Sequence, residues 1–169
     1  KFYKNRNFIY NKIKTINEAL ISDFNIKNPK IILTGLNPHA GEEGKIGIEE
    51  NKYFKPQINK LLQNNINVSG PLSADMIFNN KKIKKYDCFV CAYHDQALIP
   101  FKLMSFGRGV NYTAGLPIIR VSPDHGVGYD IVTRNIAHTS SVLASIFLGI
   151  KLYYNRKRYF ATSRKNHST

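Results

Sequence analysis

The stretch KIILTGLNPHAGEEG, residues 30–44, decides the fold. Its first part is a short apolar run that ends at Gly35, a pattern that is typical of a strand buried inside a sheet. A glycine-rich loop follows at once and continues to Gly47. We therefore expect a buried strand whose carboxyl end carries a loop with an unusual backbone path.

The pattern on either side of this strand alternates between strands and helices. Apolar residues recur near helical spacing over 5–22, and further helices are expected at 49–64 and 137–150, with Pro56 near a turn boundary or a kink. Strands are expected at 66–69 and 86–92. This alternation predicts an α/β fold with a mainly parallel sheet and helices outside it. Ligands of such sheets lie beyond the carboxyl ends of the strands.

Length and composition limit the classes of protein that fit. The chain has 169 residues, enough for one domain with its own core, and 43% hydrophobic residues exclude a disordered polar chain. No repeat or Pro/Gly/Ser-rich linker is present, and no apolar run is long enough to span a membrane. The only cysteines, Cys88 and Cys91, form a C-x-x-C inside a predicted strand, so we interpret them as core thiols in a cytoplasmic protein.

The net charge of +14 raises the question of a nucleic-acid partner. Lysine, asparagine and isoleucine, which share A/T-rich codons, contribute 56 of the 169 residues, so base composition can account for much of the lysine excess. The exception is the segment 151–169, which has six basic residues and no acidic one. We interpret it as a solvated and partly disordered basic tail. A phosphate-binding arm and a membrane-surface patch are the alternatives.

Two histidines follow two of the predicted strands. His39 lies in the loop after residues 30–35, and His94 lies directly after residues 86–92. Neutral imidazole is the commonest metal ligand, and a neighbouring carboxylate can orient it. Asp95 is placed for that role or for capping the next helix. From the residues alone, a metal site and two hydrogen-bonded loop histidines both remain open.

Further polar residues follow towards the C-terminus. Lys102, Asn111 and Arg120 are spaced nine residues apart on successive short elements and would form an anion site if they converge. The segment 122–131 holds His125, Gly126 and Asp130 beside small residues and could approach a nucleotide. No G-x-G-x-x-G motif follows a strand and no Walker A motif is present, so an ordinary Rossmann fingerprint is absent.

Five segments together resemble the 4-hydroxythreonine-4-phosphate dehydrogenase family of pyridoxal phosphate biosynthesis. The resemblance covers about residues 30–146 and implies an isocitrate/isopropylmalate dehydrogenase-like α/β/α sandwich without a standard Rossmann domain. The matching segments are TGLNPHAGEEGKIGIEE (34–50), INVSGPLSADMIF (66–78), YDCFVCAYHDQALIPFK (86–102), GVNYTAGLPIIRVSPDHG (109–126) and SSVLASI (140–146).

The resemblance also implies roles for individual residues. His39 and His94 match two of three histidines that hold a divalent metal (Zn, Mg or Co), and Asp95 and Lys102 are the expected catalytic residues. The phosphate-bearing part of the substrate would be bound by Lys102, Asn111 and Arg120, and NAD or NADP by His125, Gly126 and Asp130. The family's AGKG at 132–135 is VTRN here, which affects the expected cofactor contacts. The implied partner is a second copy, in a homodimer with active sites at the interface.

The implied reaction is oxidation of 4-phosphooxy-threonine by NAD(P)⁺, with decarboxylation to 3-amino-2-oxopropyl phosphate. The family's chain is about twice as long, and residues 1–150 resemble its C-terminal half, followed by the basic tail 151–169. Because the third histidine belongs to the other half, and because the chain begins with Lys1 and not Met, we expect an incomplete chain that is inactive alone. The alternatives are a dehydrogenase of phosphothreonate or phosphoerythronate, and a non-enzymatic basic module that binds nucleic acid.

Overall fold

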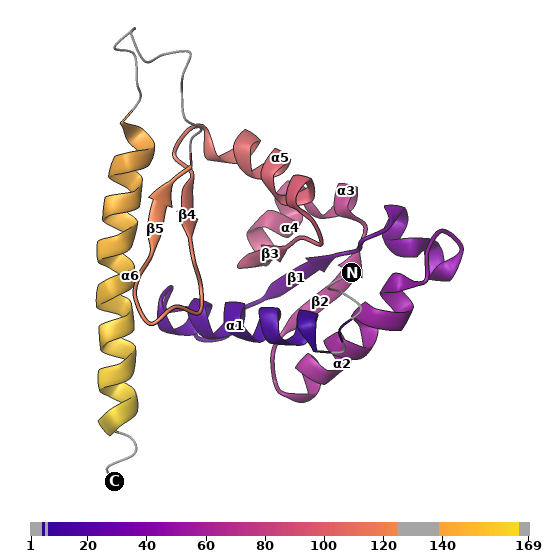
Figure 1. Ribbon diagram of the computed structural model, residues 1–169, viewed down its shortest axis with the longest axis horizontal. Coiled ribbons are helices and arrows are strands. Elements are labelled where there is room, and N and C mark those ends of the chain that lie inside the picture. The colour runs from indigo at the N-terminus through magenta and orange to yellow at the C-terminus, as the bar shows by residue number, and fades with distance from the viewer. Residues whose placement is uncertain (1–4, 6, 125–138, 166–169) are drawn as a thin grey trace, which may run out of the picture. The chain divides into compact units, whose positions relative to one another are not determined.

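The chain forms two compact units, which we describe separately. The computed structural model describes residue 5 and residues 7–124 and 139–165 (Figure 1). The first unit comprises Lys1–Ile21 and Ile26–Pro100, and the second comprises Ser22–Asn25 and Phe101–Thr169. One boundary between the units falls after Ile21, at the end of the first helix, and another falls after Pro100, inside the helix His94–Ser105. Neither boundary lies in a stretch rich in Pro, Gly or Ser.

A parallel three-stranded sheet forms the centre of the first unit. Its strands are β1 (Ile31–Thr34), β2 (Val68–Leu72) and β3 (Cys88–Val90), in the order β2-β1-β3. Ile31 pairs with Val68 on one side and with Cys88 on the other. All four residues of β1 are buried, which is expected for the central strand of a covered parallel sheet. The predicted α/β class and the parallel sheet are therefore confirmed.

Helices and helical turns connect and cover these strands. The buried positions of the first helix recur at helical spacing, and a backbone N–H of that helix donates to the buried Gln57 side chain at 3.0 Å. The elements in chain order are α1 (Phe8–Ser22), η2 (Pro38–Gly44), η3 (Glu50–Phe54), α2 (Lys55–Gln63), α3 (Ala74–Ile77), α4 (Asn80–Lys85) and α5 (His94–Ser105).

The expected helix at 49–64 is present as η3 followed directly by α2. Pro56 lies in the first turn of α2, the part of a helix where proline is tolerated. The strand expected at 66–69 begins two residues later, at Val68. The strand expected at 86–92 is shorter, because the chain leaves the sheet after Val90 and begins α5 at His94.

The second unit consists of a hairpin and one long helix. The antiparallel strands are β4 (Val110–Tyr112) and β5 (Val121–Pro123), and the helix is α6 (Ser140–Lys165). The Ser141 hydroxyl donates to the Gly109 carbonyl oxygen at 2.6 Å and accepts from the Asp124 N–H at 3.0 Å. These bonds fix the first turn of α6 against the hairpin, and the two strands and the helix lie side by side in Figure 1.

The interpretation of residues 151–169 as a partly disordered tail is wrong for residues 151–165. The helix expected at 137–150 begins at Ser140 and continues through Lys165. Leu152 is fully buried, and the Asn155 side chain donates to the Asp23 carbonyl oxygen at 2.7 Å. Burial and hydrogen bonds thus hold this basic segment in the fold, because one face of the extended helix continues to meet the rest of the unit.

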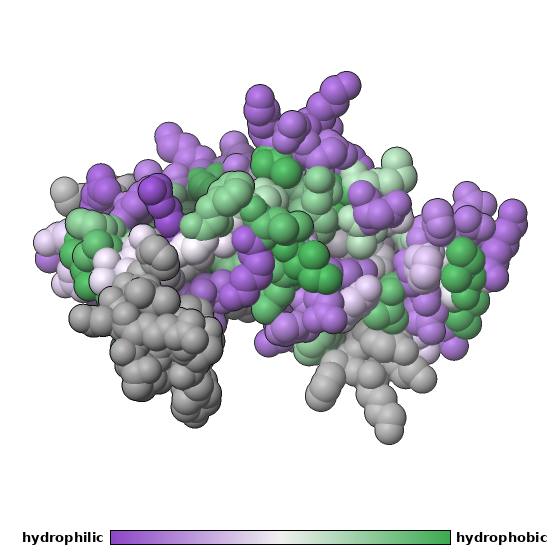
Figure 2. Space-filling model, turned by 90° about the horizontal axis from the view of Figure 1, so that it is seen from above, coloured by the Kyte–Doolittle hydropathy of each residue, from purple (hydrophilic) through white to green (hydrophobic). Residues whose placement is uncertain are grey.

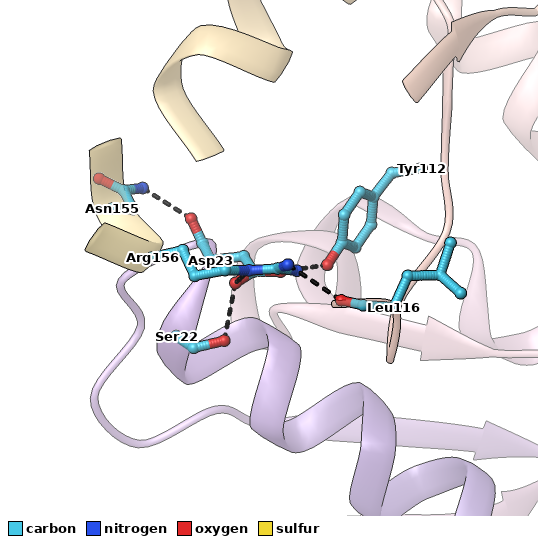
Figure 3. Close-up of polar contacts among 6 residues, drawn as sticks. All are labelled: Ser22, Asp23, Tyr112, Leu116, Asn155 and Arg156. Atoms are coloured by element: carbon cyan, nitrogen blue, oxygen red, sulfur yellow. Dashed lines mark hydrogen bonds and ion pairs between the residues drawn. The ribbon is translucent and has the colours of Figure 1, made fainter. Parts of the chain in front are cut away.

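A buried ion pair ties α6 to the segment after α1 (Figure 3). Arg156 binds both carboxylate oxygens of Asp23, with its Nε 2.7 Å from Oδ1 and its Nη2 2.5 Å from Oδ2. Tyr112 and Ser22 donate their hydroxyls to the same carboxylate, and Arg156 Nη1 donates to the Leu116 carbonyl oxygen at 2.9 Å. The Asp23 side chain is 1% exposed, so nearly all of its solvation comes from these partners.

The contacts of this cluster shift its pKa values in a consistent way. Burial alone raises the pKa of Asp23, but the hydrogen bonds from Arg156, Tyr112 and Ser22 outweigh burial and lower the pKa overall. Burial, together with the hydrogen bond to Asp23, raises the pKa of Tyr112 to about 12. The hydrogen bond to Asp23 also raises the pKa of Arg156. The fold therefore favours the charged forms of Asp23 and Arg156 and the neutral form of Tyr112.

Many large apolar side chains are exposed to solvent in the described part of the chain. Figure 2 shows hydrophobic residues in the middle of one face, with hydrophilic residues around them. Over residues 7–124 and 139–165, every helix is too short or too polar to cross a membrane.

Candidate active site

The carboxyl ends of the three parallel strands deliver polar residues at one edge of the sheet. β1 leads into η2 with His39, β2 leads to Ser73 and Asp75, and β3 leads to His94. Because the strands are parallel, all three connections leave at the same edge, where ligands bind in α/β proteins. Both histidines are exposed.

The loop that carries His39 has a rare backbone conformation. His39, Ala40, Glu42 and Glu43 have positive φ angles between 42° and 57°, although none of them is glycine. Such residues persist only where the surroundings determine the backbone strongly. The strain is concentrated at the strand end that presents the imidazole.

Glu50 is the main support of this loop. Its side chain is buried, and Oε1 accepts the backbone N–H groups of Leu36 and Asn37, each at 2.8 Å. Oε2 accepts from the Asn37 side-chain amide at 2.9 Å. A Cβ atom on Gly41, whose φ is +81°, would lie 2.7 Å from Glu50 Oε2, so only glycine fits there. One carboxylate thus fixes the entrance and the middle of the loop.

Replacing Glu50 by alanine is expected to lower the free energy of unfolding by about 2–3 kcal/mol, because two half-buried backbone N–H groups lose their buried acceptor. Glu50→Gln keeps one acceptor oxygen and is expected to lose less. Glu18→Ala, which removes a carboxylate that is 62% exposed, is the control. Urea unfolding monitored by circular dichroism measures all three variants. Equal losses for Glu50→Ala and Glu18→Ala would contradict the role of Glu50.

Asp75, which follows β2, experiences the charge of His39. The hydrogen bond from Ser73 lowers the pKa of Asp75, and the nearby charge of His39 lowers it further. Sequence reasoning did not select Asp75. The signal was its position just after a strand, which is the same signal that selected the two histidines.

The structure places Asp95 beside the His94 imidazole. Asp95 Oδ1 lies 2.8 Å from His94 Nδ1, and both side chains are mostly exposed. A carboxylate on Nδ1 orients the ring and leaves Nε2 for a ligand. This is the orienting contact that the sequence suggested for Asp95.

Gln96 connects the two loops that carry the histidines. Its Oε1 accepts from the Thr34 hydroxyl at 2.6 Å and from the Ala92 N–H at 2.9 Å, and its Nε2 donates to the Gly35 carbonyl oxygen at 2.9 Å. The ends of β1 and β3 are therefore held together by one side chain. Sequence reasoning missed Gln96, because its partners at the end of β1 lie about 60 residues away.

The donor chemistry at this edge fits a divalent metal in part. His39 and His94 would hold it through imidazole nitrogens, and such a metal supplies Lewis-acid stabilisation of a developing alkoxide. Among the described residues, no group of three or more His, Cys, Asp or Glu side chains is arranged to hold a metal ion. Further ligands would have to come from outside the described residues.

The two cysteines are not part of this site. Both are free, half-buried thiols, which agrees with a structural role. Burial, with smaller contributions from Cys91 and Asp87, raises the pKa of Cys88 to about 11, and burial raises the pKa of Cys91 to about 11.

At pH 7.5 we expect both thiols to react with iodoacetamide about a hundredfold more slowly than free cysteine, because the thiolate is the reactive form. The rate is measured by mass spectrometry of the labelled chain, with the chain in urea as the fast reference. Labelling of the folded chain at the rate of free cysteine would rule out this assignment.

In the second unit, the hairpin presents two different faces. Val121 packs against Gly149 of α6 so closely that a Cβ atom on Gly149 would lie 3.2 Å from Val121 Cγ2. Tyr112 donates its hydroxyl to Asp23, the carboxylate that also binds Arg156 of α6. Val121 and Tyr112 are paired across the strands, so their face is turned towards α6. Since side chains alternate along a strand, Asn111 and Arg120 lie on the opposite face.

Two of the three predicted anion-binding residues, Asn111 and Arg120, lie on this opposite face, and the third, Lys102 of α5, is paired with a residue just after β5. Asn111 pairs with Ser122, and Arg120 Nη1 donates to the Thr113 hydroxyl at 2.9 Å. Lys102 Nζ lies 2.8 Å from Oδ2 of Asp124, which follows Ser122 by two residues. The sequence did not indicate Asp124 and Thr113 as the partners of the two cations. These residues can offer two cationic groups and an amide to an anion.

The predicted cofactor-binding residues His125, Gly126 and Asp130 lie outside the described residues, as does the VTRN segment. The residues predicted to bind metal and substrate are all among the described residues. The cofactor contacts remain predictions from the sequence.

The chain matches proteins of known class. The family model "Pyridoxal phosphate biosynthetic protein PdxA" matches residues 5–149. A 4-hydroxythreonine-4-phosphate dehydrogenase from Sulfurihydrogenibium sp. is 46% identical over 149 residues, which are 88% of this chain and 46% of the relative. The corresponding enzyme of Zymomonas mobilis is 41% identical over 155 residues, covering 92% of this chain and 46% of the relative.

Solved structures agree with these matches. A crystal structure of 4-hydroxythreonine-4-phosphate dehydrogenase from Klebsiella pneumoniae has a TM-score of 0.72 at 37% identity, covering 86% of this chain and 45% of that one. A terephthalate 1,2-cis-dihydrodiol dehydrogenase from Burkholderia xenovorans has a TM-score of 0.67 at 31% identity, covering 86% of this chain and 46% of that one. The chain thus spans about half the length of the relatives that it matches.

Proposed function

The chain belongs to the PdxA family of pyridoxal phosphate biosynthetic proteins, and we propose that it forms one part of a 4-hydroxythreonine-4-phosphate dehydrogenase. The proposal is supported by the hairpin, where Asn111 and Arg120 lie on one face and Lys102 is paired with Asp124 at the end of β5. The strand-end histidines of the first unit support the proposal separately, as candidate metal ligands.

The proposed reaction moves a hydride from the carbinol carbon of 4-phosphooxy-threonine to NAD⁺ or NADP⁺, and the hydroxyl proton is released to the solvent. The bond between the resulting β-keto acid and its carboxylate then breaks, CO₂ leaves, and the enolate that remains takes up one proton at carbon to give 3-amino-2-oxopropyl phosphate. Lys102 and Arg120 would bind the phosphate. The binding energy gained there, away from the reacting carbon, would hold that carbon in the orientation needed for hydride transfer. Asp95 would keep the His94 ring in one orientation.

A bound phosphate would have to replace partners that the cations already have. Lys102 is paired with Asp124, and Arg120 is bonded to Thr113. The Arg120 bond is exposed, and in the other pair Lys102 is 52% exposed while Asp124 is 21% exposed. Pairs with exposed partners cost little to separate. Lys102 would therefore exchange one carboxylate for a phosphate with more negative charge.

The proposal also includes a divalent metal and a homodimer with active sites at the interface. The two imidazoles support the metal, with further ligands from the part of the family fold that this chain does not span. The resemblance to a dimeric family supports the homodimer. Both are tested by metal content and sedimentation of the purified protein.

Binding of 4-phosphooxy-threonine to the full chain tests the phosphate site, for example by NMR titration. Lys102→Ala and Arg120→Ala are each expected to weaken binding about 10–100-fold, because each removes charge-assisted hydrogen bonds. Lys157→Ala is the matched control, since it removes the same charge from an exposed position of α6. Equal weakening by Lys102→Ala and Lys157→Ala would show non-specific attraction and contradict the proposal.

A second candidate is a dehydrogenase for a related phosphorylated hydroxy acid, such as phosphothreonate or phosphoerythronate. The cations of the hairpin favour a phosphate group but do not select the remaining part of the substrate molecule. The structurally similar protein from Burkholderia xenovorans is named for a different substrate, a dihydrodiol. Turnover of a panel of these acids separates the two candidates.

A further inference from the structure

Helix α6 has a buried inner face and an apolar outer face. Its inner face contributes the buried Ser141, Ser145 and Leu152, which meet the hairpin and the rest of the second unit. Its outer face carries a stripe of apolar residues at the spacing i, i+3, i+4, i+7 and i+11, and each of them is 51–69% exposed. We call this set the outer stripe of α6; its members are Leu143, Ile146, Phe147, Ile150 and Tyr154.

A surface helix normally turns its apolar stripe towards the core. The buried face of α6 consists largely of polar residues such as Ser141 and Ser145, and its apolar stripe faces away from its own unit. The outer stripe ends after Tyr154, because the next outward positions are Lys157, Ala161 and Arg164. The surface expected to cover it is therefore limited to about three turns of the helix.

The second unit is also incomplete as a sheet. Among the described residues, β4 pairs with β5 alone. A two-stranded sheet is marginal on its own, and further strands or another packed layer are needed for stability. The missing layer and the uncovered stripe therefore lie in the same unit.

We propose that the outer stripe of α6 is the docking surface for the part of the PdxA-family fold that this chain does not span. The matched relatives are about twice as long as the match, so roughly half of the family fold must pack somewhere on this half. The stripe is the continuous apolar face of the unit whose sheet is incomplete. Since residues 140–165 contain basic residues and no acidic ones, we expect acidic side chains at the rim of the covering surface.

This occupant explains the second unit better than a second copy of the chain does. A second copy would bring the same incomplete hairpin and the same basic helix, and two basic helices repel each other. The inference rests on family membership and not on the proposed activity, so its test uses surface protection and no turnover.

The test compares cysteine labelling at position 147 in two proteins. One is the full chain with Phe147→Cys, and the other is a chimera in which the portion of the Sulfurihydrogenibium relative that this chain does not match is joined to the same variant. Labelling of the introduced thiol by iodoacetamide is expected to fall at least about tenfold in the chimera, because a covered thiol reacts only when its cover opens. Lys157→Cys lies past the stripe and is expected to label equally in both.

Equal labelling of the Phe147→Cys variant in the chain and in the chimera would overturn the proposal. In the chain alone, protection of position 147 that increases with the concentration of the chain would also overturn the proposal. That result would show that a second copy of the chain covers the stripe. If the chimera does not fold cooperatively, the separately produced portion is added to the chain, and the same protection of position 147 but not of position 157 is expected. The unsubstituted chain gives the background from Cys88 and Cys91.

Discussion

Replacing Asp23 by alanine is expected to lower the free energy of unfolding by about 3–5 kcal/mol, because it leaves the Arg156 guanidinium partly buried without its carboxylate. The variant also removes the acceptor of the Tyr112 and Ser22 hydroxyls and releases one attachment of α6. Urea unfolding followed by circular dichroism measures the loss, and α6 contributes strongly to that signal.

The matched control is the exposed pair of Lys14 and Glu18, which lie 3.8 Å apart on α1. Lys14→Ala is expected to cost about 0–1 kcal/mol, as is typical of surface ion pairs. An Asp23→Ala loss as small as the Lys14→Ala loss would show that the buried pair does not hold α6 in place.

The pH dependence of the same cluster follows from the sign of its pKa shifts. The pKa of Asp23 is lowered in the folded chain, so its contribution to stability is complete above the unfolded value of about 3.9 and is lost as pH falls through the folded pKa. The pKa of Tyr112 is raised to about 12, so its contribution is lost as pH rises from about 10 through about 12. Asp23→Asn is expected to flatten the acid side of the profile.

Replacing His94 by alanine in the chimera of this chain with the unmatched portion of the Sulfurihydrogenibium relative is expected to lower turnover at least about a hundredfold. In the proposed site His94 would hold a divalent metal, and such a metal would supply several kcal/mol of transition-state stabilisation. His94 is exposed at a strand end, so the fold should be kept. Binding of Zn²⁺ or Co²⁺ to the variant provides a readout besides activity and should weaken as well.

Asp95→Asn is the graded comparison for His94→Ala. It keeps the shape of the side chain beside His94 Nδ1 but removes its charge, and we expect a loss of about 10–100-fold. A His94→Ala chimera that keeps its turnover and its metal affinity would remove His94 from the site.

The sequence was sufficient to predict the parts of the fold that depend on local pattern. The apolar run from Ile31 to Leu33 is the central strand, and the positions of His39 and His94 at strand ends follow from the topology of parallel sheets. The nine-residue spacing from Asn111 to Arg120 brought both onto one face, because the segment between them forms a hairpin.

Other features depend on partners far apart in the chain, which a local pattern does not reveal. Glu50 and Gln96 read as surface residues of helices, yet each fixes a backbone segment at a strand end. The extension of α6 was missed because residues 151–165 are rich in basic side chains, although Leu152 and Arg156 continue its inner face. The partner of Arg156 is Asp23, which lies 133 positions earlier.

The central claim is that this chain supplies the substrate-phosphate face and two metal ligands of a PdxA-family dehydrogenase and needs the rest of the fold to act. The most direct test is the formation of NADH or NADPH from 4-phosphooxy-threonine with added divalent metal, measured for the 169-residue chain and for the chimera. We predict no turnover by the chain alone and turnover by the chimera that Lys102→Ala lowers. Turnover by the chain alone at an ordinary enzyme rate, or a folded chimera that binds the substrate without oxidising it, would contradict the account.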